Sequence, residues 1–551
     1  MDFLYRNIHM EQKKWETAAQ MTIEEDVNVP DAKGDCLSIL LKDTALHVDE
    51  TRAGRDQVVV KGSLQYQILY ETGEGGRLEQ LTGNLPFEEV INVNGATPGD
   101  LAAVKGVIED FKVSMINTRK IAIQSVVMLH ASMHQLLEEE WTDNIVNCGN
   151  GVERRFETKD VMQLCQKKSD VFRVKEEIDL PGGYPAMQNL LWKHVSLGDL
   201  EARPMDGKVS LKGDLNCYFI YMAQGVTQAI KMLTKKVPFH GLIECSGCQS
   251  DMNVSVMPVL NQSTAEIKAD MDGEDRVLFL EAVLDLQIRI YSEEKVSLLQ
   301  DIYGTSQEIE PEEKMVHAPV LHITGEGKCK LKQSHRLKEG TPKAVQILHT
   351  CGTVFRDAEN WEDGKLSLMG SVLFQILYLT GEEEMPYAVT ECMVPYSLEM
   401  EGMEKSMAEN VMTGMGDSSG NAMDSRNMAA RIMPQEKPVI FIEPRIEQAE
   451  ASLVDSEEME LKGIVAFAAL VFGSKTERCV GSVQCKPLDT AKFAALPGMV
   501  VCFADQDTPL WDYGKRYYMP VEEMKRLNNL TDDVLKAGES MLLVKGAGAG
   551  R

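Results

Sequence analysis

The sequence predicts a mainly β protein in which one module is used three times before a small domain of different pattern. Three segments share one internal spacing, with glycine at the fifth position and tyrosine at the thirteenth: Val58–Tyr70, Val209–Tyr221 and Leu366–Tyr378. A second shared segment precedes each, and the interval from its last leucine to the glycine is constant: Val29–Leu40, Leu180–Leu191 and Leu337–Leu348. Repetition at linked points indicates a repeat protein, which is typical of scaffolds and binding arrays.

The segment with the glycine has the pattern of a strand. In the first copy Val58, Val60, Leu64 and Tyr66 share one parity, and polar residues fall largely on the other. Alternation with β-branched and aromatic residues predicts a half-buried strand. The shared glycine predicts a bulge or a close backbone approach. These glycines are Gly62, Gly213 and Gly370.

A polar turn follows each copy, and then a second strand that ends in proline and an aromatic residue. The pairs are Pro86-Phe87, Pro238-Phe239 and Pro395-Tyr396, which we interpret as the closing ends of hairpins. Later strand pairs are predicted around Lys120–Met133, Arg276–Tyr291 and Glu458–Phe472. Many short strands and almost no long amphipathic helix predict β-sandwich-like or small-barrel modules.

The modules are expected at residues 22–135, 172–295 and 315–475, with linkers at Glu138–Arg155 and Glu293–Lys314. The third module carries an insertion at 400–433, where methionines lie among Gly, Ser, Asn and Asp without a helical or strand period. We favour a disordered loop there. Adaptive binding of an apolar partner by the methionines is the alternative.

Composition narrows the function classes. The 551 residues are 44% hydrophobic, enough for several packed cores, and carry a net charge of −28. Such a charge disfavours nucleic acid or an anionic membrane as the main partner. The N-terminal segment does not resemble a signal peptide, and no run approaches the ~20 apolar residues that span a bilayer. The sequence therefore predicts a cytoplasmic protein without a transmembrane segment.

Neither cysteine nor histidine positions suggest catalysis. The twelve cysteines are scattered and are expected to be reduced thiols. Cys245 and Cys248 form a single CxxC without a second pair, which favours a loop with free thiols over a zinc site. His130 and His134 have helical spacing but follow a strand pattern. There is no HExxH or phosphate-binding loop motif, so we expect no enzyme, catalytic residue, metal or cofactor.

From Gly498 the pattern changes. Val500–Ala504 and Met541–Val544 are predicted strands, and between them Thr508–Tyr518 and Val521–Asn528 are predicted short helices. The layout is strand, helix, helix, strand.

This segment, residues 498–545, resembles a LysM domain. The residues that carry the resemblance follow the family's order: Asp507, Thr508, Leu510, Trp511, Tyr517, Val521, Glu522, Leu527, Asn528, Leu530, Leu535, Gly538, Leu542 and Val544. The chain departs from the family pattern at three places. Gln506 replaces a turn glycine, Pro509 is an extra residue, and Tyr513-Gly514 occupies a face that holds Ile-Ala in the family.

The resemblance implies a binding site between the loop after the first strand and the loop before the last, where the family holds N-acetylglucosamine-containing glycans. The residues of these loops are Asp505, Gln506, Asp507, Thr508, Pro509, Leu510, Trp511, Asn529, Leu530, Leu535, Lys536, Ala537 and Gly538. Trp511, Leu530 and Leu535 are candidate interface anchors. Leu510 and Leu527 are expected in the domain's own core, and both roles stay open for Trp511.

The three upstream modules resemble the SPOCS domain of sporulation proteins, through the glycine strand, its terminal tyrosine and the proline–aromatic pair. Three such modules followed by one LysM domain resemble the SipL family over about residues 22–545. The resemblance implies a non-enzymatic spore coat assembly scaffold in the mother-cell cytoplasm, at the forespore surface. Its LysM domain is expected to bind a SpoIVA-like coat-basement ATPase and to act with other spore coat proteins. The alternative is a cell-wall or cortex protein that binds peptidoglycan.

Overall fold

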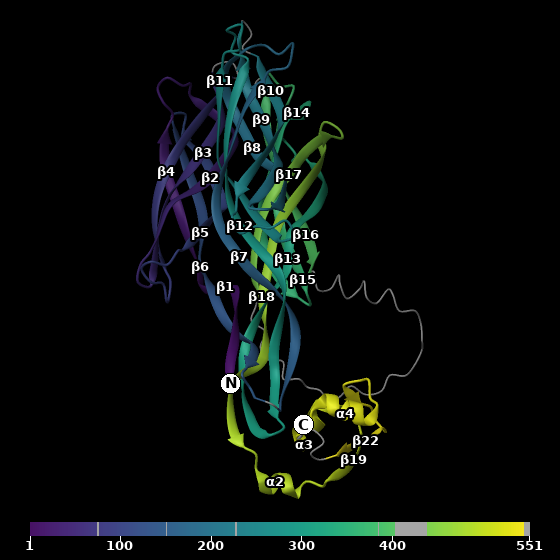
Figure 1. Ribbon diagram of the computed structural model, residues 1–551. Helices are drawn as coiled ribbons and strands as arrows, with labels where there is room; N and C mark the ends of the chain where they lie inside the picture. Colours follow the sequence, from purple (N-terminus) through teal and green to yellow (C-terminus); the bar gives the residue numbers. More distant parts are fainter. Residues whose placement is uncertain (74–76, 150, 226–228, 384, 403–437, 545–551) are drawn as a thin grey trace.

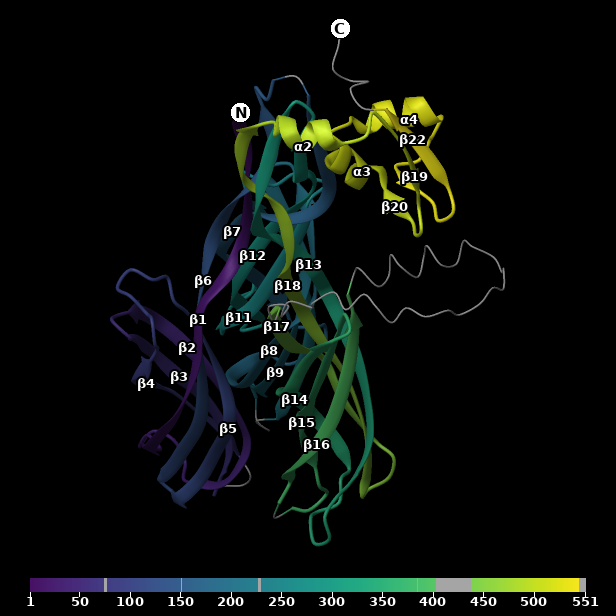
Figure 2. The same ribbon diagram turned by 90° about the horizontal axis from the view of Figure 1, so that it is seen from below.

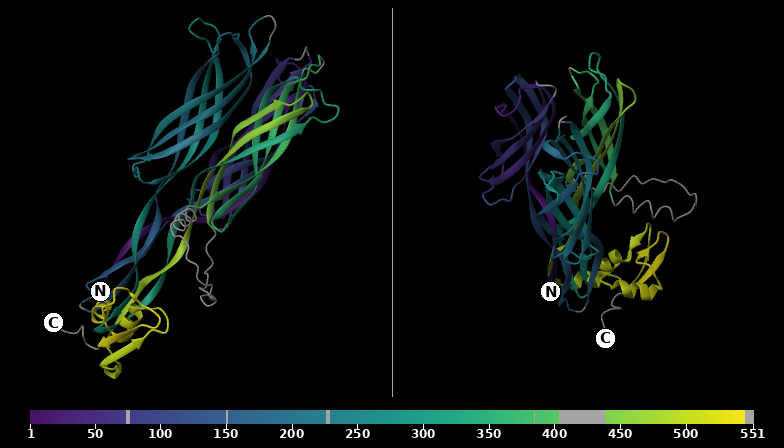
Figure 3. Two further views of the ribbon diagram at one scale, coloured as in Figure 1. Left: turned by 90° about the vertical axis from the view of Figure 1, so that its right-hand side faces the viewer. Right: turned by 90° about the horizontal axis from the view of Figure 1, so that it is seen from above.

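The computed structural model describes residues 1–544 except 74–76, 150, 226–228, 384 and 403–437. Three β-sandwiches lie at one end of an elongated molecule, a narrower stalk continues from them, and a small domain lies beside the far end of the stalk (Figures 1 and 3). The N-terminus also lies at that far end. Among the described residues, no helix has the length and apolar character needed to cross a membrane.

Each repeat has six strands in two three-stranded antiparallel sheets. The sheet orders are β1-β6-β5 and β2-β3-β4, then β7-β12-β11 and β8-β9-β10, then β13-β18-β17 and β14-β15-β16. The first repeat comprises β1 Asp2–Asn28, β2 Cys36–Ala53, β3 Gln57–Thr72, β4 Leu78–Asn92, β5 Ala103–Asn117 and β6 Lys120–Val146. The second comprises β7 Val152–Asp179, β8 Met187–Met205, β9 Lys208–Ala223, β10 Ile230–Glu244, β11 Asn253–Lys268 and β12 Val277–Gly304. The third comprises β13 Gln307–Arg336, β14 Gln346–Glu362, β15 Lys365–Leu379, β16 Tyr387–Glu401, β17 Val439–Leu453 and β18 Glu458–Pro487.

The two sheets of each repeat enclose a separate hydrophobic core, and Figure 2 shows the purple first sandwich apart from the green third one. A further cluster, which includes Leu41, Trp192 and Leu377, joins the three sandwiches where β2, β8 and β15 meet. The predicted mainly β fold with repeated modules is confirmed. The predicted strands at Val58–Tyr70 and its two copies are β3, β9 and β15.

The repeated glycine allows a close approach, as predicted. A side chain at Gly213 would meet the carbonyl oxygen of Asp199 at 2.6 Å and the ring of Phe239 at 2.7 Å. Gly62 and Gly370 have the same two kinds of neighbour. Opposite each glycine, the bulge belongs to the preceding strand and not to the strand that holds the glycine.

The predicted hairpins are present as β3–β4, β9–β10 and β15–β16, but the proline–aromatic pairs do not end their strands as expected. β4 continues to Asn92, and Phe87 pairs across the sheet with Gly62. The ring therefore covers the glycine and compensates for its missing side chain. Pro86 has no backbone N–H to donate. It is tolerated because β4 is an edge strand, whose outer edge has no neighbouring strand to pair with.

The terminal tyrosine links the two shared segments. Tyr221 is fully buried, and its hydroxyl donates to the carbonyl oxygen of Pro185 at 3.2 Å. Tyr378 donates to Pro342 at 3.2 Å in the same way, and Tyr70 donates to Gly34 at 3.4 Å. The constant interval between the segments in the sequence follows from this shared contact.

The six longest strands, β1, β6, β7, β12, β13 and β18, have 27 to 30 residues and run through two cores. One half of each lies in a sandwich, and the other half forms a two-stranded ribbon. Three such ribbons pack together as the stalk around a shared core: Ile8, Trp141, Val161, Val296, Leu298, Val316, Ala318 and Cys479. Each ribbon lacks a core of its own, so the stalk depends on all three repeats.

One extra residue marks the passage from sandwich to stalk in each repeat. These bulges fall at equivalent positions: Lys14, Cys165 and His322. Side chains alternate between the two faces of a strand, so one inserted residue exchanges the buried and exposed parities. In β1, the even-numbered Ile8 lies in the stalk core, whereas the odd-numbered Trp15 and Ile23 lie in the sandwich core.

The segments expected as linkers, Glu138–Arg155 and Glu293–Lys314, lie mostly in these stalk strands. Consecutive glutamates at the start of each segment concealed the alternation of exposed and buried positions, and Trp141 is among the buried ones. The predicted module limits omit the stalk. The predicted insertion at 400–433 lies between β16 and β17, and its residues 403–433 lie outside the described residues.

Candidate functional site in the C-terminal domain

The C-terminal domain has the predicted order of strand, helix, helix and strand. α2 (Thr490–Ala495) follows β18, and β19 (Met499–Phe503) pairs antiparallel with β22 (Ser540–Val544). α3 (Leu510–Tyr517) and α4 (Val521–Asn528) complete the domain. Its core consists of Cys502, Ala504, Leu510, Met519, Met524, Leu535, Met541 and Leu543.

The structure brings together the two loops that the resemblance singled out. β20 (Thr508–Pro509) pairs with β21 (Val534–Leu535), which joins the loops directly. The carboxylate of Asp507 accepts a hydrogen bond from the backbone N–H of Ala537 at 2.9 Å. The backbone N–H of Leu510 donates to the carbonyl oxygen of Asp533 at 2.8 Å. The loops therefore form one continuous surface.

The predicted site residues differ in exposure. Seven are exposed: Asp505, Gln506, Asp507, Asn529, Lys536, Ala537 and Gly538. Thr508, Pro509 and Leu530 are half-buried, and Leu510, Trp511 and Leu535 are buried. The exposed set offers carboxylates, amides and an ammonium group, which suit hydrogen-bonded recognition of a polar ligand or protein surface.

The hydrophobic residues of the domain differ in burial. Leu535 is fully buried in the domain core, so its side chain is not accessible to a partner. Leu510 is buried as expected, but Leu527 is 40% exposed, and the expectation that it belongs to the core is wrong. Met524, one turn earlier, is the buried side chain of α4.

Trp511 is an anchor, but for the stalk of the same chain. Its indole N–H donates to the carboxylate of Asp301 on β12 at 2.8 Å. Its ring meets that of Tyr303 edge to face, with centroids 4.7 Å apart. Only 9% of Trp511 remains exposed.

Other side chains extend this contact between α3 and the stalk. The ammonium group of Lys515 lies 2.8 Å from the Asp301 carboxylate. The hydroxyl of Tyr303 donates to the carbonyl oxygen of Met519 at 2.8 Å, and Tyr518 donates to Glu308 at 3.0 Å. Burial, followed by the charges of Glu153 and Asp301, raises the pKa of Tyr303, so this hydroxyl keeps its proton.

The sequence interpretation missed Asp301, Tyr303 and Glu308 because it placed them in a linker. Strand period alone does not find Tyr303, because the extra residue Gln300 shifts the alternation after the buried Val296 and Leu298. The partner of Tyr303 is also hidden in the sequence, since its contacts cross more than 200 residues.

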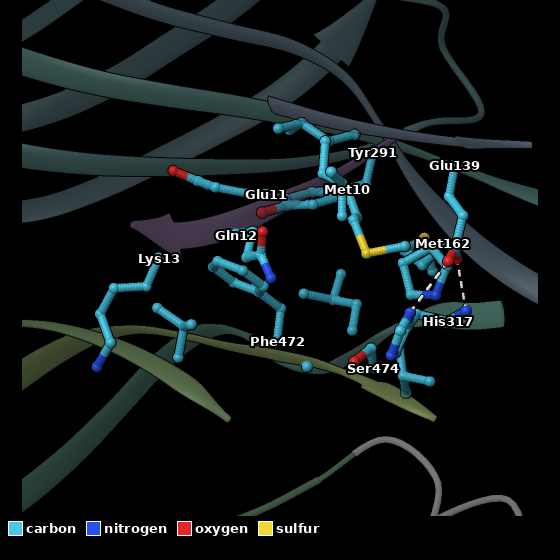
Figure 4. Close-up of a pocket in the computed structure, with 17 residues that line it drawn as sticks. Met10, Glu11, Gln12, Lys13, Glu139, Met162, Tyr291, His317, Phe472 and Ser474 are labelled. Carbon is cyan, nitrogen blue, oxygen red and sulfur yellow. Dashed lines mark hydrogen bonds and ion pairs between the residues drawn. The ribbon is translucent and has the colours of Figure 1, made fainter. Parts of the chain in front are cut away.

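A pocket with a volume of about 370 Å³ lies where the sandwiches meet the stalk (Figure 4). Met10, Met162 and Phe472 contribute apolar surface, each from a different repeat. On one side, Nδ1 of His317 lies 3.1 Å from the carboxylate of Glu139. The volume is within the range of small-molecule sites.

A buried ion cluster lies beside this pocket. The carboxylate of Glu11 accepts from Arg289 at 2.8 Å and from Lys167 at 2.7 Å, and its side chain is 1% exposed. Burial opposes ionisation of Glu11, but these partners outweigh it and hold its pKa below the ordinary value. The Arg289 guanidinium lies 4.2 Å from the centroid of the Phe441 ring. The cluster thus joins all three repeats.

The CxxC segment is a tight turn after β10. The N–H of Cys248 donates to the carbonyl oxygen of Cys245 at 2.9 Å. Both thiols are buried, which raises their pKa values, and all twelve cysteines are free thiols. Across the described part of the chain, no group of three or more His, Cys, Asp or Glu side chains could hold a metal ion.

Comparison with protein families found two matches to the model described as SipL, SPOCS domain, at residues 35–116 and 186–268. These spans correspond to β2–β5 and β8–β11, the same four strands of the first and second repeats. They support a SipL-like protein related to sporulation and do not include the third repeat or the C-terminal domain. Searches of curated proteins and of solved structures found no match.

Proposed function

We propose that this chain is a non-enzymatic scaffold for spore coat assembly in the mother-cell cytoplasm, at the forespore surface. In this proposal the C-terminal domain is a LysM-type domain that binds a SpoIVA-like coat-basement ATPase. The observation that carries the proposal is the SipL, SPOCS match to equivalent strands of two repeats. The third repeat is counted as a third SPOCS module because its strands have the same order.

The C-terminal domain supports a binding role. Its strand–helix–helix–strand order agrees with the LysM resemblance, and its two loops form one surface through β20 and β21. The acidic, repeated β architecture supplies a rigid support for such a surface. The alternative function, recognition of peptidoglycan glycans, would use the same loops.

Binding of the purified full chain to the ATPase and to peptidoglycan tests the proposal. We expect ATPase binding without co-sedimentation with peptidoglycan. The variant Asp507→Ala removes the hydrogen bond between the loops and should weaken ATPase binding about tenfold, since a loop hydrogen bond to a carboxylate contributes roughly 1.5–3 kcal/mol. Arg526→Ala, on α4 outside the two loops and with a side chain 81% exposed, is the matched control. Peptidoglycan binding without ATPase binding would reject the scaffold in favour of the glycan alternative.

A further inference from the structure

The contact between α3 and the end of the stalk has the properties of a specific binding site. Figures 1 and 2 both place α3 against the stalk. Asp301 receives two donors from α3, the indole N–H of Trp511 and the ammonium group of Lys515, at 2.8 Å each. Tyr303 adds a ring contact and a hydrogen bond to Met519. We call Asp301 and Tyr303 together the stalk receptor.

Only one of the three stalk ribbons carries this receptor. The second bulge of each ribbon aligns the repeats, and it places Asn144 and Ser482 at the positions equivalent to Asp301. Val146 and Gln484 take the place of Tyr303. A carboxylate followed two residues later by a tyrosine is therefore a feature of the second repeat alone, and not a general property of the stalk.

The domain side is shaped for the same contact. Gly514 stands where the LysM resemblance leads us to expect alanine, although glycine within a helix costs about 1 kcal/mol relative to alanine. A side chain there would collide with the hydroxyl of Tyr303, and it would lie 2.8 Å from the carbonyl oxygen of Met519. Glycine at position 514 therefore leaves room for the hydroxyl group of Tyr303.

The charged part of this contact is open to solvent. The side chain of Lys515 is 42% exposed and that of Asp301 is 25% exposed. A solvent-exposed ion pair contributes only about 0–1 kcal/mol, so charged groups of a partner can compete for it.

We propose that the stalk receptor covers Trp511 reversibly, and that a protein partner releases the domain by presenting the same chemistry, a carboxylate beside an aromatic ring. This rests on the proposed function, because Trp511 belongs to the first of the two recognition loops. The indole N–H and the ring face used by the stalk cannot serve a partner at the same time. Docking therefore lowers the apparent affinity by the fraction of molecules in which Trp511 is covered.

Charge exchange in the full chain tests this proposal. Asp301→Lys and Lys515→Asp each place like charges together and should undock the domain, whereas the double variant restores an opposite pair. Glu313→Lys is the matched control, since Glu313 is 70% exposed and lies 3.9 Å from Arg478 on another part of the stalk.

Acrylamide quenching of tryptophan fluorescence reports docking without any partner. Each single variant should gain one accessible tryptophan relative to the wild type and the control, and the double variant should lose part of that gain. Adding Trp511→Phe to a single variant should abolish the gain, which assigns it to Trp511. Unchanged quenching in the single variants would overturn the proposal.

Titration with the coat-basement ATPase then measures release. Asp301→Lys should bind at least about tenfold more tightly than the wild type, with the double variant in between. Equal or weaker binding by an undocked Asp301→Lys would overturn the proposal, because the stalk would then not compete with the partner. Absence of ATPase binding by every form would reject the proposed function and partner release with it, while quenching would still decide whether the stalk covers Trp511.

Discussion

The sandwiches and the stalk are built from the same six long strands but follow different rules. Each sandwich encloses its own core, so all three repeats keep the same glycine, aromatic ring and tyrosine. The three ribbons share the hydrophobic clusters of the stalk, and equivalent positions there differ: Trp141, Leu298 and Cys479 belong to one cluster. One tryptophan, one leucine and one cysteine fill this space together, so the three repeats contribute side chains of different volume.

His134, Tyr291 and Phe472 show the same divergence at the junction, where each pairs with the residue next to the bulge of the neighbouring strand. The position of Glu11 also differs between the repeats, since its equivalents are Met162 and Pro319. Positions that are the same in all three repeats therefore lie where each repeat packs within its own sandwich. Positions that differ lie where the repeats pack against one another.

The largest effect is expected in the stalk, from Trp141→Ala. Trp141 is fully buried among residues of all three repeats, so the variant should lose about 3–5 kcal/mol of unfolding free energy. Urea unfolding monitored by hydrogen exchange of β6 measures the loss. Leu136→Ala on the same strand is the control, since Leu136 is 56% exposed. A loss below about 1 kcal/mol would contradict a shared stalk core.

The second-largest effect is expected in the ion cluster around Glu11, at the junction of the sandwiches and the stalk. Arg289→Leu copies the residue at the equivalent position of the third repeat, Leu470, and leaves the buried Glu11 with Lys167 at 2.7 Å and His134 at 4.0 Å. We expect a loss of about 3 kcal/mol in the same unfolding assay. Adding Glu11→Met, copied from Met162, should recover most of it. If the double variant were as unstable as the single one, the unpaired carboxylate would not be the cause.

In the sandwiches, Gly213→Ala should cost about 1–3 kcal/mol, because the new methyl group meets a backbone oxygen at 2.6 Å. Hydrogen exchange should show the loss in the second sandwich and spare the first. Gly182→Ala, with no atom within 4 Å of its added carbon, is the control. Loss of protection in all three sandwiches would argue against independent cores.

The smallest effect concerns pH. Burial lowers the pKa of His134 to about 4, so the unfolded chain binds a proton more readily than the folded one. The contribution of the neutral His134 imidazole to the free energy of unfolding is fully present above pH 6.5 and is lost as the pH falls towards 4. His134→Phe, copied from Phe472, should remove about 1–2 kcal/mol of the decrease between pH 7 and pH 5. Parallel pH dependences for the variant and the wild type would exclude His134 as the source.

The sequence by itself determined the features that rest on local pattern. Alternation and shared spacing predicted β3, β9 and β15, and the order of elements predicted the C-terminal domain. The resemblance to LysM domains singled out its two loops, and the structure joins them through β20 and β21. These predictions succeed because period, turn residues and repetition are visible within short segments.

Only the tertiary structure decided the stalk and the state of Trp511. One inserted residue at Lys14 shifts the alternation and hides which face of β1 is buried. The role of Trp511 depends on Asp301, a residue 210 positions away whose neighbours carry no local signal of the contact. Leu527 and Met524 differ in burial because α4 packs with Met524 toward the sheet, which the helical spacing alone does not specify. Contacts between distant segments set these features, so they appear only once the ribbons and the domain are packed together.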